Sequence, residues 1–179
     1  MKNKITLLLL FVGLMSFSQQ IKFTEKVWRV NFLNPGVELE VPTSNYSTFS
    51  VGLGVGYGGS YPKTSSGGSG FLYSINPFLD VQHKWFYNFE KRKEKKRATD
   101  NNSGNFISAR LFTRGNTITS NFNRTSNFDF AVGPTWGIQR KYGKNFHLLF
   151  DVGPIYYFDT KGNHNFFPIM VQLNLGFDL

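Results

Sequence analysis

The residues of this chain with the most obvious chemistry are charged side chains set singly between apolar neighbours. Arg29, for example, stands between Trp28 and Val30. On the inner face of a narrow closed sheet such charges have to pair, because an unpaired buried charge is strongly destabilising. The candidates for an interior charge network are Arg29, Glu38, Glu40, Asp80, Arg110, Asp129 and Asp151, with His147 among them. We expect opposite charges in this set to pair, and Arg110 to lie near a carboxylate.

Catalytic residues are harder to find. None of the three histidines, His83, His147 and His164, falls in a Ser-His-acid spacing, and a lone histidine is more often polar surface or filler. The chain has no cysteine, which excludes disulfides and thiolate metal sites. We therefore expect no catalytic, cofactor or metal site, and an enzyme that acts on lipid remains an alternative.

A glycine-rich stretch, residues 52–56, superficially resembles a phosphate-binding loop. Its glycines follow a strict period of two and no helix pattern comes after them, whereas a phosphate loop leads into a helix. We interpret these glycines as small residues that make room inside a narrow barrel.

The formal net charge is +9, and much of it lies in one basic segment. The basic residues of this segment are Lys91, Arg92, Lys93, Lys95, Lys96 and Arg97. Such a run is typical of a solvated turn, here one that can touch anionic lipid headgroups. An exported protein meets little nucleic acid, so we expect no nucleic-acid partner.

Residues 1–18 have the pattern of a secretory signal peptide. Lys2 and Lys4 precede an apolar run over residues 5–15, and the small residues Ser16 and Ser18 follow it. The mean hydropathy of −0.27 excludes a helical membrane protein unless one segment carries all the apolarity. We predict export, with residues 19–179 forming one domain.

Most of the remaining chain alternates between apolar and polar residues. In residues 167–179 the odd positions are apolar and most even ones polar or small, over enough length for a transmembrane strand, which needs about 9–11 residues. Counting Asn34-Pro35-Gly36 as a turn, the sequence predicts an all-β fold: a closed antiparallel up-and-down transmembrane β-barrel of about eight strands. We expect apolar side chains to face lipid. In a soluble secreted barrel, the alternative, they would face inward.

Aromatic residues cluster near the ends of several predicted strands, which is typical of an aromatic belt at a membrane boundary. The candidate interfacial aromatics are Trp28, Trp85, Phe86, Tyr87, Trp136, Tyr156 and Tyr157.

Short motifs add a resemblance. Residues 17–19 (FSQ), 30–40 (VNFLNPGVELE), 85–88 (WFYN) and 102–106 (NSGNF) together resemble small outer-membrane β-barrel proteins of the Bacteroidota. The resemblance implies an outer-membrane location and a last strand that the barrel assembly machinery reads. Leu173, Leu175 and Phe177 match that strand pattern, although the chain ends in Leu179 rather than an aromatic residue.

From these observations we expect a structural or interaction barrel with a narrow packed lumen and exposed extracellular loops. Its partners would be outer-membrane lipids and the assembly machinery, and the sequence indicates no particular extracellular ligand. The alternatives are an outer-membrane lipid-modifying enzyme and a soluble ligand-binding barrel.

Overall fold

The computed structural model describes residues 23–60, 72–122 and 126–179. The expected signal peptide, residues 1–18, and most of the expected loop at residues 60–70 lie outside the described residues. The strands are β1 Val27–Asn31, β2 Gly36–Ser44, β3 Ser47–Ser60, β4 Leu72–Phe86, β5 Gly104–Arg114, β6 Thr119–Ser120, β7 Asp129–Tyr142, β8 Phe146–Asp159 and β9 His164–Asp178. A short helix, α2 Phe89–Glu94, and a 3-10 helix, η1 Asp100–Asn102, lie between β4 and β5.

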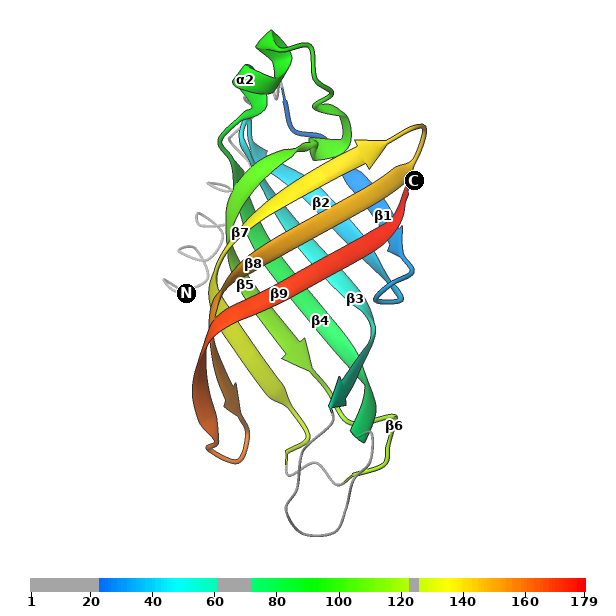
Figure 1. The fold of residues 1–179 in the computed structure, drawn as a ribbon, viewed down its shortest axis with the longest axis vertical. Coiled ribbons are helices and arrows are strands. Elements are labelled where there is room, and N and C mark those ends of the chain that lie inside the picture. Colours follow the sequence, from blue (N-terminus) through cyan, green and yellow to red (C-terminus); the bar gives the residue numbers. More distant parts are fainter. Residues whose placement is uncertain (1–22, 61–71, 123–125) are drawn as a thin grey trace, which may run out of the picture.

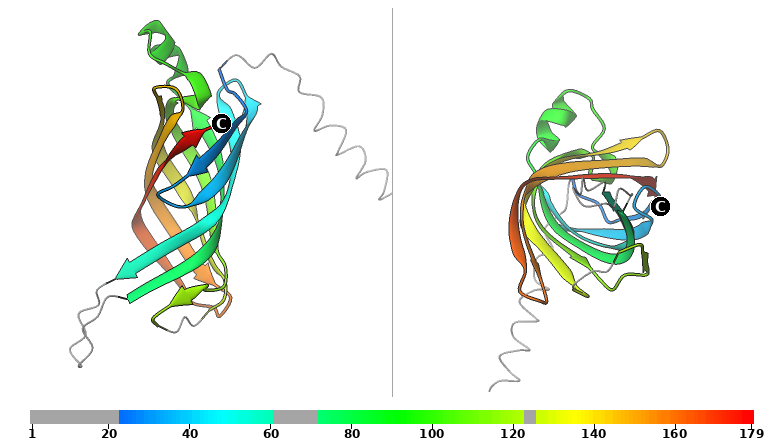
Figure 2. Two further views of the ribbon diagram at one scale, coloured as in Figure 1. Left: turned by 90° about the vertical axis from the view of Figure 1, so that its right-hand side faces the viewer. Right: turned by 60° about the horizontal axis from the view of Figure 1, so that its bottom comes forward.

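Eight of these strands form a closed antiparallel ring, as predicted (Figures 1 and 2). β1 pairs with both β2 and β9, and β3 pairs with β4, so the order returns to its start. The two-residue β6 adds only a short extension beside β4. The turn predicted at Asn34-Pro35-Gly36 is confirmed, since residues 32–35 form a turn between β1 and β2 and Gly36 begins β2.

The predicted sense of the alternation is also confirmed. On β9, Val171 is 58% and Leu173 is 40% exposed, while the intervening Gln172 is half-buried and Asn174 is 7% exposed. Successive side chains of a strand point to opposite faces of the sheet. Apolar side chains therefore cover the outside of the ring, and polar ones fill the inside.

The barrel has two distinct ends. At the turn end lie α2, the tight connections at residues 45–46 and 143–145, and the carboxyl terminus; at the loop end lie β6 and the turn at residues 160–163 (Figure 1). Neither helix in the described part of the chain has the length and apolarity to cross a membrane.

A cluster of buried apolar side chains, mostly aromatic and called the aromatic cluster below, fills the mouth of the barrel at the turn end. Its members are Phe23, Phe86, Phe89, Phe106 and Leu149. The ring of Phe86 stacks on that of Phe89 at 4.6 Å between centroids. Phe86 was expected at the membrane boundary and instead lies inside, 2% exposed. It shares the inward parity of Lys84 on β4, so its side chain continues the interior face.

An irregularity in β9 changes its side-chain parity near the loop end. Gly153 pairs with Met170 but Ile155 pairs with Phe167, so β9 has one extra residue there. Such a bulge turns the preceding residues to the other face, and Phe167 faces the same side as Ile155. Tyr157, expected at the boundary, is half-buried on this side, with its ring 6.4 Å from that of Phe167.

Candidate functional site

Arg29, at the centre of the turn-end half of the lumen, is completely buried. Its Nε donates to Asp178 Oδ1 at 3.0 Å, and its Nη1 donates to Glu38 Oε1 at 3.2 Å and to Glu40 Oε2. The same guanidinium thus joins β1, β2 and β9, the strands that meet where the ring closes. This geometry pairs three of the expected lumen charges.

Lys84 is a second buried cation in the same place. Its Nζ lies 3.2 Å from Glu38 Oε1 and 3.5 Å from Glu40 Oε2, and it donates to Gln139 Oε1 at 3.0 Å. Gln139 in turn donates to Glu40 Oε2 at 3.0 Å. We call Arg29, Glu38, Glu40, Lys84, Gln139 and Asp178 the ion-pair plug. Because its members come from strands all around the ring, they fill this half of the lumen.

A second polar layer lies beside the plug, towards the loop end. Arg110 donates through Nε and Nη2 to the two oxygens of Asp80, both at 2.8 Å, and its Nη1 is 3.5 Å from Asp151 Oδ1. Gln172 donates to Asp80 and Gln82 to Asp151. We call these five residues the middle layer. Arg110 is therefore paired, as the sequence analysis expected.

Three members of the plug, Lys84, Gln139 and Asp178, were not among the predicted lumen residues. The signal was parity, since Lys84 lies two positions from Gln82 and four from Asp80 on β4, all on the inner face. Asp129 has the inward parity of β7 but lies at the loop-end rim, away from the plug, where Ser126 donates to its Oδ1 at 2.7 Å.

The basic segment, expected as a solvated turn, is part of the connection between β4 and β5, residues 87–103, which covers the turn end and which we call the cap. All of its charged groups are exposed except Arg92, which is half-buried and donates to the Ala98 carbonyl. The chain beyond it reaches back into the barrel, where the Asn101 carbonyl accepts from Arg29 Nη2 at 3.1 Å and Asn101 Nδ2 donates to Asp178 at 2.9 Å. The cap and the ion-pair plug are thus one connected structure.

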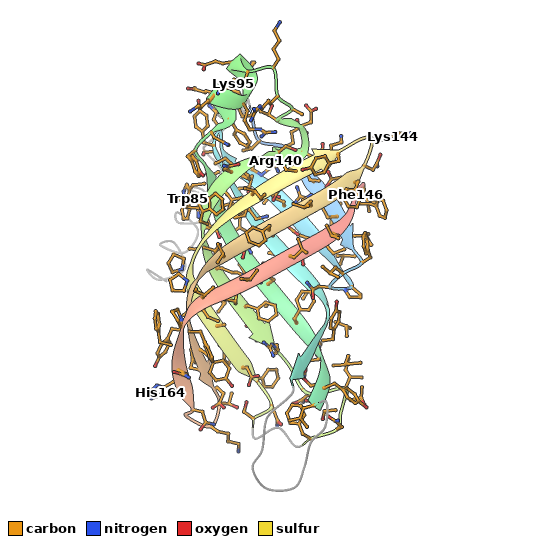
Figure 3. The ribbon with its side chains drawn as sticks, in the orientation of Figure 1. Trp85, Lys95, Arg140, Lys144, Phe146 and His164 are labelled. Atoms are coloured by element: carbon orange, nitrogen blue, oxygen red, sulfur yellow. The ribbon has the colours of Figure 1, made fainter. Side chains whose placement is uncertain are left out.

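The other expected interfacial aromatics are exposed on the outer face. Trp85 and Trp136 flank Ile107 on neighbouring strands, and Trp136 donates through Nε1 to the hydroxyl of Tyr87 at 2.7 Å. Trp28 is also exposed near this end, and Tyr156 lies towards the loop end. Figure 3 shows Trp85 at the outer side of the wall near the turn end.

The three histidines lie in three different parts of the barrel. His147 is completely buried, 3.5 Å from Asp178 Oδ1, and does not reach the outer face. His83 hydrogen-bonds Thr43 at 3.2 Å, and the His164 ring stacks on Tyr156 near the loop end (Figure 3). In the described part of the chain, no group of three or more His, Asp or Glu residues is placed to hold a metal ion.

The loop-end half of the lumen contains a cavity of about 430 Å³, which we call the loop-end pocket. Rings of Phe78 and Phe112, stacked at 5.6 Å between centroids, form part of its wall. Ala131, Ile155 and Phe167 also line it, and Arg110 of the middle layer borders it. The volume is within the range of small-molecule sites, about 300–1,000 Å³.

Comparisons of the chain with protein-family models, with curated proteins and with solved structures found no match.

Proposed function

We propose that this chain is an integral outer-membrane β-barrel of the Bacteroidota type, with a structural or interaction role and no open pore along its axis. The observation that carries the proposal is the reversed distribution of side chains. Large apolar residues such as Phe166 and Ile169 are exposed, while Arg29, Lys84 and Glu40 are completely buried. A water-soluble barrel has the opposite arrangement.

The size of the apolar surface supports the same proposal. Exposed apolar residues occur on all eight ring strands, from Trp28 on β1 to Phe177 on β9. Soluble monomers rarely expose large continuous apolar patches, which mark membrane or protein contacts. Trp85, Tyr87 and Trp136 at the turn end fit an aromatic belt at a headgroup boundary.

The plug and its cap support the absence of an axial pore. Two cations and three carboxylates occupy the lumen at the turn end, and Phe86, Phe89 and Phe106 pack behind them. An eight-stranded ring is just wide enough to be filled by side chains. In planar bilayers the protein should therefore give no steady conductance.

The proposed outer-membrane location also implies an orientation and partners. Short turns of outer-membrane barrels face the periplasm, so the turn end would lie there, with the basic segment near inner-leaflet phospholipids. The signal peptide would direct export, and the assembly machinery would read β9, which closes the ring against β1.

The test is membrane fractionation followed by electrophoresis with and without heating. We expect the protein in the outer-membrane fraction, and a shift in gel mobility after boiling, because a folded membrane barrel resists detergent until it is heated. A protein that stays in the aqueous extract without detergent would refute the proposal and favour the soluble ligand-binding barrel.

A further inference from the structure

The wall of the barrel is incomplete on one side of the loop-end half. The pairing of β1 with β9 ends at Asn31 and Gly176, and that of β2 with β3 ends at Gly36 and Gly54. The β1–β2 hairpin ends there, at the turn at residues 32–35, and does not extend into the loop-end half of the wall. The facing edges of β3 and β9 continue towards the loop end with no strand between them in the described chain (Figure 1).

We call this interruption the notch. Asn34 marks its turn-end limit, since its Nδ2 donates to the Leu173 carbonyl at 3.2 Å and to Asn174 Oδ1 at 2.8 Å. On the other side, the Val55 N–H donates to the Pro35 carbonyl at 2.8 Å. The loop-end pocket reaches both edges, because its lining includes residues of β3 and of β9. The notch is therefore a side opening of the pocket.

The side chains around the notch belong to the apolar outer surface. Tyr57 on β3 is 61% exposed and Ile169 on β9 is 70% exposed. If the barrel spans a membrane as proposed, the notch lies at the depth of the hydrocarbon. At that depth, unpaired backbone is tolerated only where it is buried in protein or lines a water-filled cavity. The edges of β3 and β9 border the loop-end pocket.

The wall opposite the notch carries two cations. Arg110 is neutralised by Asp80 and Asp151 of the middle layer. The guanidinium of Arg114 lies 5.7 Å from the centroid of the Phe112 ring and makes no hydrogen bond or ion pair with any described residue. Asp129 is opposite Arg114 in the strand register, but its carboxylate accepts from Ser126. Arg114 thus brings an unpaired positive charge to an aromatic-lined pocket.

We propose that the loop-end pocket binds a single-chain anionic amphiphile of the fatty-acid class, with its carboxylate at Arg114 and its chain leaving through the notch between β3 and β9. This inference rests on the proposed membrane location. The charge of Arg114 selects an anionic head, the rings of Phe78 and Phe112 suit an alkyl chain, and the notch gives that chain a route to the bilayer. The pocket volume suits one chain with a small head better than a two-chain phospholipid.

The test is binding of 11-(dansylamino)undecanoic acid to the folded protein in a zwitterionic detergent, with displacement by oleate. Arg114→Gln should weaken binding by about tenfold or more, because a charge-assisted contact is lost. Lys161→Gln removes one exposed charge from the loop-end turn and should leave the affinity unchanged. Oleate should displace the probe from the wild-type protein, while methyl oleate and phosphatidic acid should not.

A second variant tests the pocket itself. Ala131→Trp places a large ring in the cavity and should reduce probe binding by about tenfold or more through steric exclusion. The mobility shift after boiling must persist in each variant, so that a loss of binding is not a loss of folding. Equal affinity of the wild-type, Arg114→Gln and Ala131→Trp proteins would refute the amphiphile site while leaving the proposed membrane barrel intact. Displacement by phosphatidic acid rather than oleate would also overturn the fatty-acid assignment.

Discussion

The two halves of this barrel use the same ring of strands in opposite ways. In the turn-end half, Arg29 and Lys84 tie together carboxylates from several strands, and an aromatic cluster closes the mouth. The loop-end half contains a cavity of about 430 Å³ and an interrupted wall. The comparison shows that the same ring can be filled or hollow. It is filled where charged side chains from several strands pair across the lumen, and it contains a cavity where they do not.

The largest expected effect comes from breaking the centre of the plug. Arg29→Met leaves Asp178 without its cation and Glu38 and Glu40 with Lys84 alone, and removing one partner of a buried ion pair costs about 3–5 kcal/mol. We expect the free energy of unfolding to fall by that amount, measured by urea titration in lipid vesicles with tryptophan fluorescence.

The matched control is Arg114→Met in the loop-end half. The Arg114 side chain is exposed and unpaired with described residues, so the change in stability should stay within about 0.5 kcal/mol. Similar losses for the two variants would contradict the contrast between a locked and an open half.

The next effect tests the aromatic cluster. Phe89 is 1% exposed and stacks between Phe23 and Phe86, and truncation of a buried Phe to Ala costs about 3–5 kcal/mol. At the end of the barrel the cap can open locally, so we expect Phe89→Ala to cost about 3 kcal/mol. Trypsin should then cut the basic segment, residues 91–97, faster. Phe128→Ala, at an exposed loop-end position, should leave the cleavage rate unchanged; acceleration in both variants would show that the cap is not held by this cluster.

Two substitutions on β7 that enlarge a side chain compare the packing in the two halves directly. A Cβ added at Gly137 would lie 2.7 Å from the Phe150 carbonyl oxygen and also against the Phe106 ring. Gly137→Ala should therefore destabilise the barrel by about 1–3 kcal/mol, the usual effect of overpacking. Ala131→Leu adds more volume but faces the loop-end pocket, so its cost should be below about 1 kcal/mol. Thermal unfolding of both variants measures this, and an equal cost would mean that the loop-end pocket is as tightly packed as the plug.

The smallest effect concerns an exposed contact of the cap. The Tyr46 hydroxyl donates to Glu90 Oε1 at 2.6 Å, and this hydrogen bond raises the pKa of Tyr46 above its ordinary value. Since the pKa is higher in the folded protein, the contribution of Tyr46 to stability is present below the ordinary tyrosine pKa of about 10 and is lost as the pH rises through the folded pKa. In ultraviolet difference titrations against Tyr46→Phe, the Glu90→Gln variant should ionise Tyr46 at lower pH than the wild-type protein does. An unchanged titration would mean that the contact does not persist in solution.

Much of the architecture was accessible from the sequence because strand alternation is local information. The parity of residues 171–177 predicted which side chains of β9 face outward, and Asn34-Pro35-Gly36 predicted the extra turn that makes eight strands. Part of the interior was accessible for the same reason. Arg29, Glu38 and Glu40 were predicted to face inward. Lys84 was not, although it shares the inward parity of Asp80 and Gln82 on β4.

Non-local packing overrides the local sequence pattern in several places. Phe86 was expected at the membrane boundary because of its aromatic neighbours, but the cap above it encloses the inner face of β4. The basic segment was predicted to be a simple turn. Its composition does not show that Asn101, a few residues later in the chain, hydrogen-bonds to Arg29 inside the barrel. In β9, one extra residue near Pro168 reversed the parity of Phe167.

By itself, the sequence determined the eight ring strands and the face that most of their side chains take, since these depend on a period of two along the chain. Only the tertiary structure decided which charges meet, that the chain between β4 and β5 closes one end, and that the short β1–β2 hairpin leaves a notch between β3 and β9. The physical reason is that pairing across a ring brings together residues far apart in sequence, such as Arg29 and Asp178, and alternation carries no information about which distant strand ends where.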